Sequence, residues 1–179
     1  VLRDNVAELN ELIQEILDFR KAEDEGFNQA QIELVAISQL LCKQYQWFQS
    51  LAEQQQIQFT LNQLETLHWQ TDPLYFKKII TNLLSNAFKY TQQGGIVKVN
   101  VEIKDEHLWL SVYNTGQGIP QAKLKNLFNR YGIIGSMESE QHSGTSRHGL
   151  GLFICHSLVQ ALSGQIEVRS EEGTYRSEE

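Results

Sequence analysis

Residues 72–91 read DPLYFKKIITNLLSNAFKYT, and this stretch predicts one long amphipathic helix. Asp72 is a favourable N-cap residue, and Pro73 suits the first helical position because an N–H there has no intrahelical partner in any case. The helix is expected to run to about Tyr90. Its apolar side, which should face a core, carries Ile80, Leu83, Leu84 and Ala87.

The opposite side of this helix is polar. Asn82, Asn86 and Lys89 fall at positions i, i+4 and i+7 and therefore project from one face, with Tyr90 beside them. Asparagine is unfavourable inside a helix, so two on one face need a reason. An amide oxygen can complete the coordination of Mg²⁺ alongside phosphate oxygens and water, and a nearby ammonium can neutralise phosphate charge. A solvated polar face is the simpler alternative for this helix taken alone.

Strand and helix patterns flank this helix on both sides. Before it we expect a strand, a helix and two strands around a polar turn: Ile32–Ile37, Ser38–Gln55, Ile57–Leu61 and Leu67–Thr71. After it we expect two strands, a helix, a polar stretch, a helix and a strand: Ile96–Ile103, Leu108–Tyr113, Gln121–Tyr131, Gly132–His148, Gly149–Leu162 and Gln165–Ser170. This order predicts an α+β fold, a two-layer α/β sandwich with a mixed, mostly antiparallel sheet, rather than a doubly wound sheet.

The front of the chain reads as a separate helix. Its apolar residues recur at steps of four, three, four and three, which is a heptad seam: Leu2, Val6, Leu9, Ile13 and Ile16, widened by Leu12 and Leu17. An ordinary core-packing helix fits the seam equally well. The polar stretch Lys21–Gly26 favours a helix stop and hinge, so we place domain boundaries at residues 1–24 and 25–179.

Composition excludes several classes of partner. The 179 residues carry a net charge of −7, which repels nucleic-acid backbones and anionic lipid, so no nucleic acid is expected to bind. No apolar run is long enough to span a membrane. Cys42 and Cys155 stand singly and are interpreted as buried thiols in a reducing compartment. The piece is therefore expected to be cytoplasmic.

Two further groups suit a ligand that carries phosphate. Asn114 ends a predicted strand, and Gly116 and Gly118 behind it allow backbone to approach a flat ligand closely. Gly149-Leu150-Gly151-Leu152 opens the last helix, where free N–H groups and the helix dipole favour an anion, and Arg147 and His148 add donors. Each group alone is explained equally well by a turn or by close packing.

Together, in this order and spacing, these groups resemble the ATPase domain shared by histidine kinases, DNA gyrase, Hsp90 and MutL, and most closely the histidine kinase branch of this GHKL superfamily. Residues 82–91 look like the N box, 114–118 the first glycine box, 127–131 the F box and 149–152 the second glycine box. The resemblance covers about residues 30–170 and implies a Bergerat-type fold. The front helix is similar to the second helix of the kinase dimerisation and phosphotransfer hairpin. Its Asp18–Glu23 ending is similar to that of Bacteroides-type hybrid two-component sensors.

The resemblance implies a role for each matching residue. Asn86 would ligate Mg²⁺, Asn82 would support the metal or the phosphates, and Lys89 would contact phosphate. Tyr90 would pack near the adenine and Asn114 would bind its amino group, in a pocket shaped by Gly116 and Gly118. Residues 132–148 would form the ATP lid. The phosphates would be held by Arg147, His148, Gly149, Leu150, Gly151 and Leu152.

Three departures from the family pattern stand out. Asn114 replaces the usual Asp, which keeps an acceptor for the adenine amino group but loses a charge, at a cost of ~1 kcal/mol. Ser146, Arg147 and His148 replace an upstream glycine, so the lid hinge is expected to be stiffer. Residues 173–179 stand where the family adds a strand, which is expected to be missing or replaced.

The resemblance also implies the reaction. Hydrolytic relatives carry Glu at the position of Asn82, and an amide cannot take a proton from water. The expected activity is therefore γ-phosphoryl transfer from Mg-ATP to a histidine of the dimerisation domain in a homodimer, and then to a response-regulator receiver domain. None of the chain's five histidines lies in an acceptor box, so the acceptor is expected before residue 1 and the fragment should not phosphorylate itself. The alternatives are a non-catalytic nucleotide-responsive scaffold and a hydrolytic ATPase.

Overall fold

The computed structural model describes residues 30–128 and 150–171. These fall into two compact units, which are treated separately. The first, here called the sheet unit, comprises residues 31–120 and 169–171. The second, here called the α5 unit, comprises residue 30 with residues 121–128 and 150–168.

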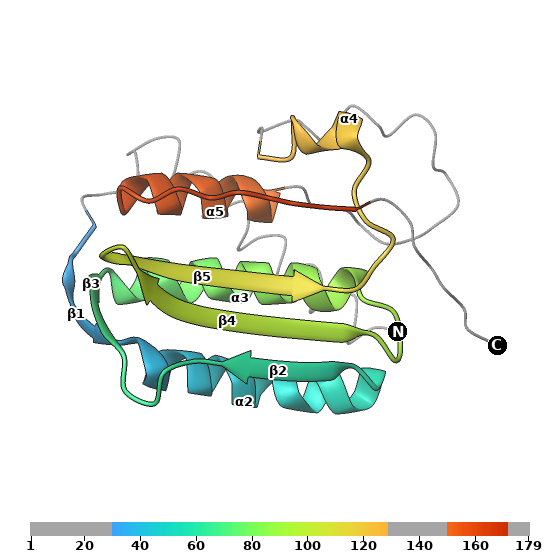
Figure 1. Ribbon diagram of the computed structural model, residues 1–179, viewed down its shortest axis with the longest axis horizontal. Helices are drawn as coiled ribbons and strands as arrows, with labels where there is room; N and C mark the ends of the chain where they lie inside the picture. Colours follow the sequence, from blue (N-terminus) through green and yellow to red (C-terminus); the bar gives the residue numbers. More distant parts are fainter. Residues whose placement is uncertain (1–29, 129–149, 172–179) are drawn as a thin grey trace, which may run out of the picture. The chain divides into compact units, whose positions relative to one another are not determined.

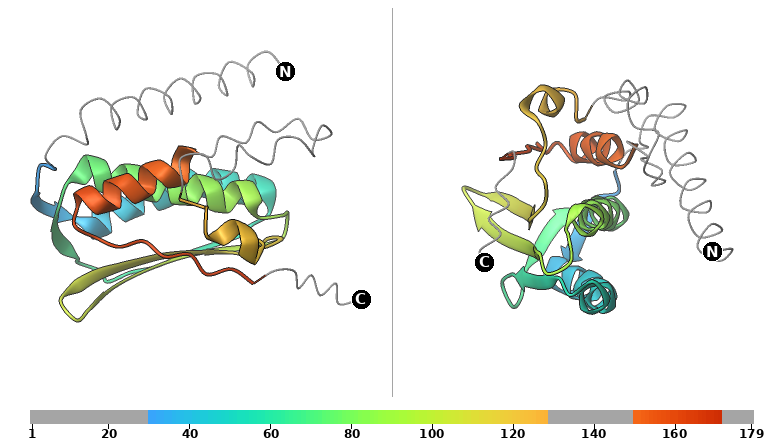
Figure 2. Two further views of the ribbon diagram at one scale, coloured as in Figure 1. Left: turned by 90° about the horizontal axis from the view of Figure 1, so that it is seen from above. Right: turned by 90° about the vertical axis from the view of Figure 1, so that its right-hand side faces the viewer.

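The sheet unit is an α+β structure with a mixed sheet, as predicted (Figure 1). In its three-stranded sheet, β4 is parallel to β2 and antiparallel to β5. Strands β1 and β3 form a separate antiparallel pair, and helices α2 and α3 lie on the same face of the three-stranded sheet (Figure 2). The bounds are β1 Glu33–Ala36, α2 Ile37–Gln55, β2 Gln58–Asn62, β3 His68–Thr71, α3 Pro73–Tyr90, β4 Ile96–Lys104 and β5 His107–Asn114.

The core of the sheet unit lies between these helices and the sheet. Phe88 of α3 is its aromatic centre, with ring centroids 5.2 Å from Phe48 in α2 and 5.1 Å from Phe59 in β2. The inward residues of β4 alternate with exposed ones and are buried, as a strand with one covered face requires. The fully buried side chains of the sheet unit include Ile37, Leu41, Ile80, Leu84, Val97 and Val99.

Helix α3 has the bounds that its sequence predicts. The buried Asp72 carboxylate accepts hydrogen bonds from the N–H groups of Leu74 at 2.9 Å and Tyr75 at 3.0 Å. Its second oxygen accepts from the N–H of Gln31 at 2.8 Å, which fastens the start of α3 to the segment before β1. At the other end, the Thr91 hydroxyl donates to the carbonyl of Ala87 at 2.6 Å. The backbone of Thr91 is extended, and the helix ends there.

Strands β2 and β3 follow one another around a polar turn but do not pair. Local alternation predicts that both are strands and leaves their partners open. The connection between them is held at the start of α2, where the buried Ser38 hydroxyl accepts from the N–H of Leu67 at 2.6 Å. This directs β3 towards β1, while β2 joins β4 through the pair Phe59 and Val97.

The first helix of the α5 unit is shorter than predicted. Helix α4 spans only Gln121–Leu124, because the next backbone bonds reach three residues back, from Asn126 to Lys123 and from Leu127 to Leu124, rather than four. The predicted last three residues of this helix, 129–131, lie outside the described residues. Helix α5 spans Leu150–Ala161, close to the predicted Gly149–Leu162.

The strand expected over Gln165–Ser170 is wrong, because residues 162–171 contain no strand. The alternation that predicted it is present, since Ile166 and Val168 are half-buried between exposed neighbours. A strand also needs a backbone ladder, and alternation cannot supply the partner. Within the sheet unit, Ser170 is held by a side-chain bond instead, accepting from the N–H of Ile119 at 2.7 Å.

The two cysteines differ. Cys155 in α5 is buried as predicted, whereas Cys42 in α2 is exposed, and that prediction is wrong. Leu41 is the residue of this turn that faces the core, and the next position is rotated by about 100° around the helix. In the part of the chain that the structure describes, every helix is too short or too polar to cross a membrane.

Candidate functional site

The polar face of α3 is built as the sequence predicts. Asn82 and Asn86 are half-buried and Lys89 is exposed, while the other side of the helix packs into the core. The Asn86 side chain makes no hydrogen bond to any described residue. The Lys89 ammonium lies 5.9 Å from the centroid of the Tyr90 ring, and that ring is 53% exposed. The face therefore offers an amide, a cation and an aromatic surface to a ligand.

A polar contact joins this face to α2. The amide oxygen of the buried Gln44 lies 3.0 Å from the hydroxyl of Thr81, and the same hydroxyl lies 2.8 Å from the Lys77 carbonyl oxygen, so the two acceptors share one proton. Thr81 directly precedes Asn82, so this contact between two helices lies at the N-terminal end of the face. Sequence reasoning missed Gln44, because one Gln within an amphipathic helix gives no signal of burial.

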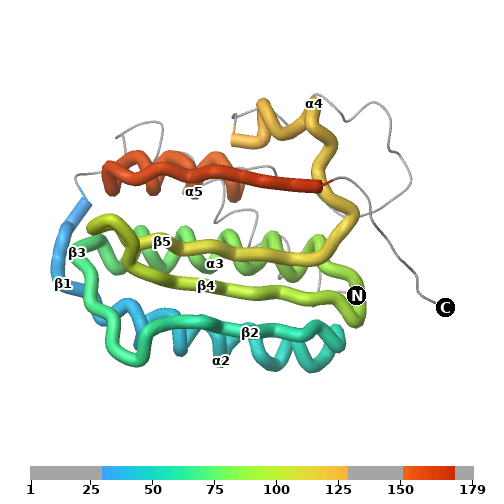
Figure 3. The backbone as a smooth tube through the Cα atoms, in the orientation of Figure 1, coloured from blue at the N-terminus to red at the C-terminus, as the bar shows by residue number. Residues whose placement is uncertain are grey.

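The glycine turn, residues Asn114–Gly118, packs against the C-terminal end of α3 (Figure 3). A β-carbon on Gly116 would lie 2.6 Å from the Tyr90 carbonyl oxygen, so glycine is required by contact with α3. Gly118 has a φ of +73°, a conformation that favours glycine. The sequence interpretation left ligand approach and an ordinary turn open for both glycines, and the structure gives each a reason within the fold. It also brings Asn114 and Tyr90, which are 24 positions apart in the chain, to one end of the unit.

Asn114 is half-buried at the end of β5, and a hydrogen bond orients its side-chain amide. Its Nδ2 donates to the carbonyl of Thr115 at 3.4 Å. Because a carbonyl only accepts, the atom facing it must be the nitrogen, and Oδ1 is left pointing elsewhere as an acceptor. An acceptor is the group that an exocyclic amino group requires.

Two residues of this region were not singled out from the sequence. The Thr115 hydroxyl oxygen accepts from the N–H of Ile96 at 2.8 Å. A β-carbon on Gly95 would lie 2.6 Å from that hydroxyl oxygen and 2.5 Å from a methyl carbon of Thr91. Neither residue is given a role of its own in the site by the sequence analysis. The positions of Thr91 and Thr115 could have pointed to these contacts, because the two residues directly follow Tyr90 and Asn114, which are predicted to bind the ligand.

The second glycine box lies in the α5 unit. Leu150 begins α5, and the half-buried Gly151 and Leu152 follow in its first turn. Arg147, His148 and Gly149 lie outside the described residues, as does the whole of the predicted lid, residues 132–148. Within this unit the rings of Phe128 and His156 stack with centroids 5.6 Å apart, which agrees with a packing role for His156.

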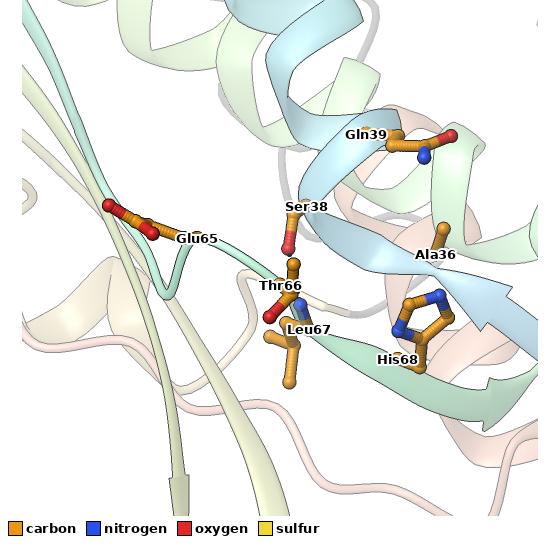
Figure 4. A pocket seen from close by; sticks show the side chains of 7 residues that line it. All are labelled: Ala36, Ser38, Gln39, Glu65, Thr66, Leu67 and His68. Carbon is orange, nitrogen blue, oxygen red and sulfur yellow. Dashed lines mark hydrogen bonds between the residues drawn. The ribbon is translucent and has the colours of Figure 1, made fainter.

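A small pocket in the sheet unit lies apart from these groups. It is lined by Ala36, Ser38, Gln39, Glu65, Thr66, Leu67 and His68 (Figure 4). Its volume is about 50 Å³, whereas sites for drug-sized ligands have about 300–1,000 Å³. It includes none of the predicted site residues and is too small for a nucleotide.

The half-buried Asn86 amide suits Mg²⁺. This ion usually takes one or two protein oxygens and completes its octahedron with water and substrate phosphates. An amide oxygen on a helix, which leaves the other coordination positions to water and phosphate, matches that requirement. Near the opposite end of α3, burial and the neighbouring Asp72 carboxylate raise the pKa of Tyr75.

An α+β fold with a mixed sheet and helices on one face defines a class of domain, and comparison with known proteins identifies the family. The sequence profile of the histidine kinase-, DNA gyrase B- and HSP90-like ATPase family matches residues 71–176. The chain belongs to this family. The resemblance to the ATP-binding domain of sensor histidine kinases is thereby confirmed.

Relatives among characterised proteins include sensor proteins. The sensor protein SrrB of Staphylococcus aureus strain N315 is 29% identical over 173 residues, which is 97% of this chain and 29% of SrrB. SrrB of strain NCTC 8325 is 28% identical over the same length. The chain therefore spans less than a third of the length of these relatives. None of them tests the Bacteroides-type origin, which stays a prediction.

Solved structures share the fold. The Acinetobacter baumannii histidine kinase AdeS has a TM-score of 0.69 at 20% identity, covering 89% of this chain and 71% of that one. Full-length ShkA in complex with AMPPNP has a TM-score of 0.72 at 21% identity, covering 94% of this chain and 35% of that one. Histidine kinase ThkA in complex with the response regulator protein TrrA has a TM-score of 0.69 at 21% identity, covering 89% and 43%. At these identities the likeness shows the fold alone.

Proposed function

We propose that this chain is the catalytic domain of a sensor histidine kinase, which binds Mg-ATP and transfers its γ-phosphoryl group to a histidine of the dimerisation domain. One observation carries the proposal. The glycine turn packs directly on the end of α3, where a β-carbon on Gly116 would meet the Tyr90 carbonyl oxygen at 2.6 Å. A group suited to adenine and a face suited to phosphate and metal are therefore parts of one rigid unit.

The phosphate end of this site is assigned to α3. Asn86 supplies an amide oxygen to Mg²⁺, and Lys89 places its ammonium beside the phosphate oxygens. Mg²⁺, when bound, neutralises the charge that develops on the transferring group. Asn82, one turn earlier on the same face, supports the metal or the phosphates. Because all three project from one helix, their spacing is fixed before the ligand arrives.

The base end is assigned to the glycine turn. Asn114 presents Oδ1 to the adenine amino group, and the exposed Tyr90 ring packs near the base. Gly116 and Gly118 shape the turn beneath it. Arg147, His148, Gly149, Leu150, Gly151 and Leu152 are proposed to hold the phosphates from the second glycine box.

The residue at position 82 favours transfer over hydrolysis. An Asn amide cannot accept the proton of an attacking water, so the site positions phosphate without activating water. The nucleophile is then a histidine imidazole supplied by another segment. We place that histidine on the dimerisation hairpin of a homodimer, with residues 1–24 as its second helix. The phosphoryl group passes from there to a receiver domain on the cytoplasmic side of a membrane sensor.

Phosphoryl transfer in trans tests the proposal. The fragment is mixed with a dimerisation hairpin carrying the acceptor histidine and with γ-labelled Mg-ATP. Label should accumulate on the hairpin and not on the fragment, and Asn86→Ala should abolish it. Asn100→Ala is the matched control, because this Asn lies on the exposed face of β4, bonded to Asn62 at 2.8 Å, and should transfer normally.

One observation favours a second function, a nucleotide-responsive scaffold without catalysis. Asn114 removes the charge that the family uses to bind adenine, which lowers affinity. Calorimetry that detects Mg-nucleotide binding without any transfer to the hairpin would favour the scaffold. Steady phosphate release without labelling of any histidine would favour a hydrolytic ATPase.

A further inference from the structure

We infer that Thr115 is a positioning residue, whose hydroxyl fixes the base end of the site against the phosphate end. This inference rests on the proposed function. Thr115 directly follows Asn114, and its contacts join three segments: the start of β4, the loop after α3 and the glycine turn itself.

The first contact is with β4. The Thr115 N–H donates to the carbonyl of Ile96 at 2.9 Å, and its hydroxyl oxygen accepts from the N–H of Ile96 at 2.8 Å. The side chain thus supplies the acceptor that a backbone carbonyl would supply in a longer strand. This fixes the backbone at the residue after Asn114, whose own amide donates to the Thr115 carbonyl.

The second contact is with the loop after α3. Gly95 lies so close that a β-carbon on it would be 2.6 Å from the Thr115 hydroxyl oxygen and 2.5 Å from a methyl carbon of Thr91. Thr91 is buried and its hydroxyl donates to the Ala87 carbonyl in the last turn of α3. A continuous set of contacts therefore runs from α3 through Thr91 and Gly95 to Thr115.

The third contact is made by the residue that follows Thr115. Gly116, the next residue, packs against the Tyr90 carbonyl at the end of α3. Thr115 therefore stands between two close contacts with the end of α3 and the loop behind it. Loss of its hydroxyl leaves the Ile96 N–H without this acceptor and frees Asn114 to shift relative to the Asn86 face.

The hydroxyl can be tested apart from the shape of the side chain. Thr115→Val keeps the branched shape and removes the oxygen, whereas Thr115→Ser keeps the oxygen. Thr60→Val, at an exposed Thr on β2, is the control. Calorimetry measures Kd for Mg-AMPPNP, for ADP and for Mg-tripolyphosphate, which lacks the base, and thermal unfolding checks that each variant is folded.

The expected result is selective for the base. Thr115→Val should weaken Mg-AMPPNP and ADP by about tenfold, the loss of one well-placed hydrogen bond, and leave Mg-tripolyphosphate unchanged. Thr115→Ser should stay within about twofold of the wild type, since it restores the same bond. If Thr115→Val does not fold, Thr115→Ala, which removes the same hydroxyl and adds no new contact, replaces it with the same expectation.

Two results would overturn the inference while leaving the proposed function intact. One is an unchanged nucleotide Kd in Thr115→Val, and the other is an equal loss for tripolyphosphate, which indicates a general structural role. If the wild-type chain binds neither nucleotide nor tripolyphosphate, the proposed function itself fails.

Discussion

Helix α3 and the glycine turn make up the two ends of one candidate site, and they are specified in different ways. The helix is specified locally: its cap, its proline and its polar and apolar faces all lie within residues 72–91. The turn is specified by its neighbours, because Gly116 is shaped by Tyr90 and Thr115 by Ile96 and Gly95. A ligand group on a helix can therefore be found by periodicity, whereas one on a turn depends on contacts distant in sequence.

The largest effect is expected where the two regions touch. Gly116→Ala places a methyl group 2.6 Å from the Tyr90 carbonyl oxygen, so the turn and the helix end must separate. We expect a loss of about 2–3 kcal/mol in the free energy of unfolding, as for overpacking, measured by urea denaturation.

Gly94→Ala is the control for this substitution. It has no atom within 4 Å but a φ of +79°, so only backbone strain of about 1 kcal/mol should appear. Equal losses in the two variants would show that the Tyr90 contact does not constrain Gly116.

The second-largest effect is expected at Asp72, the N-cap residue of α3. Asp72→Ala removes the acceptor of three backbone N–H groups at a buried position, and we expect a loss of about 2 kcal/mol by thermal unfolding. Asp72→Asn retains one acceptor oxygen and should lose less. An Asp72→Ala variant as stable as the wild type would contradict the view that α3 is fixed by its own cap.

A third, smaller effect tests the base end of the turn. Asn114→Asp restores the charge typical of the family and should strengthen Mg-AMPPNP binding about fivefold, or ~1 kcal/mol, because a charged acceptor bonds the adenine amino group more strongly. Calorimetry on both proteins gives the comparison. Unchanged affinity would show that residue 114 does not contact the base.

The smallest effect is a pH dependence at the start of α3. The pKa of Tyr75 is raised above 10.0, first by burial and then by the Asp72 carboxylate, so the folded state holds the phenolic proton more tightly than the unfolded state. Its contribution to stability is complete below pH 10.0 and is lost as pH rises through the raised pKa. Urea denaturation from pH 9 to 11 should show a shallower decline in Tyr75→Phe, and identical slopes would contradict this.

The same contrast explains what could be predicted from the sequence. Helix α3 is predicted from Pro73 to Tyr90, and the strands of the β4–β5 hairpin are predicted from the alternation of Ile96–Ile103 and Leu108–Tyr113. Alternation also predicted a strand at Gln165–Ser170, but a strand needs a partner that the local pattern does not name. The exposure of Cys42 depends on helix phase, which a broad apolar stripe does not fix.

The residues of the candidate site differ in the same way, because some could be predicted from local spacing and others depend on contacts between distant segments. Asn82, Asn86 and Lys89 were found on one face because helical spacing alone places them there. The contact of Gln44 with Thr81 beside that face and the packing of Gly95 on Thr115 depend on segments far apart in the chain, and only the fold brings them together.

The central claim is that the polar face of α3 binds nucleotide through a metal at Asn86. Its most direct test is Kd for AMPPNP, measured by calorimetry with Mg²⁺ and with EDTA, on the wild type and on Asn86→Ala. The account predicts that Mg²⁺ strengthens wild-type binding by roughly tenfold or more and that Asn86→Ala removes this gain. An equal Mg²⁺ gain in both proteins, or none in the wild type, would contradict it.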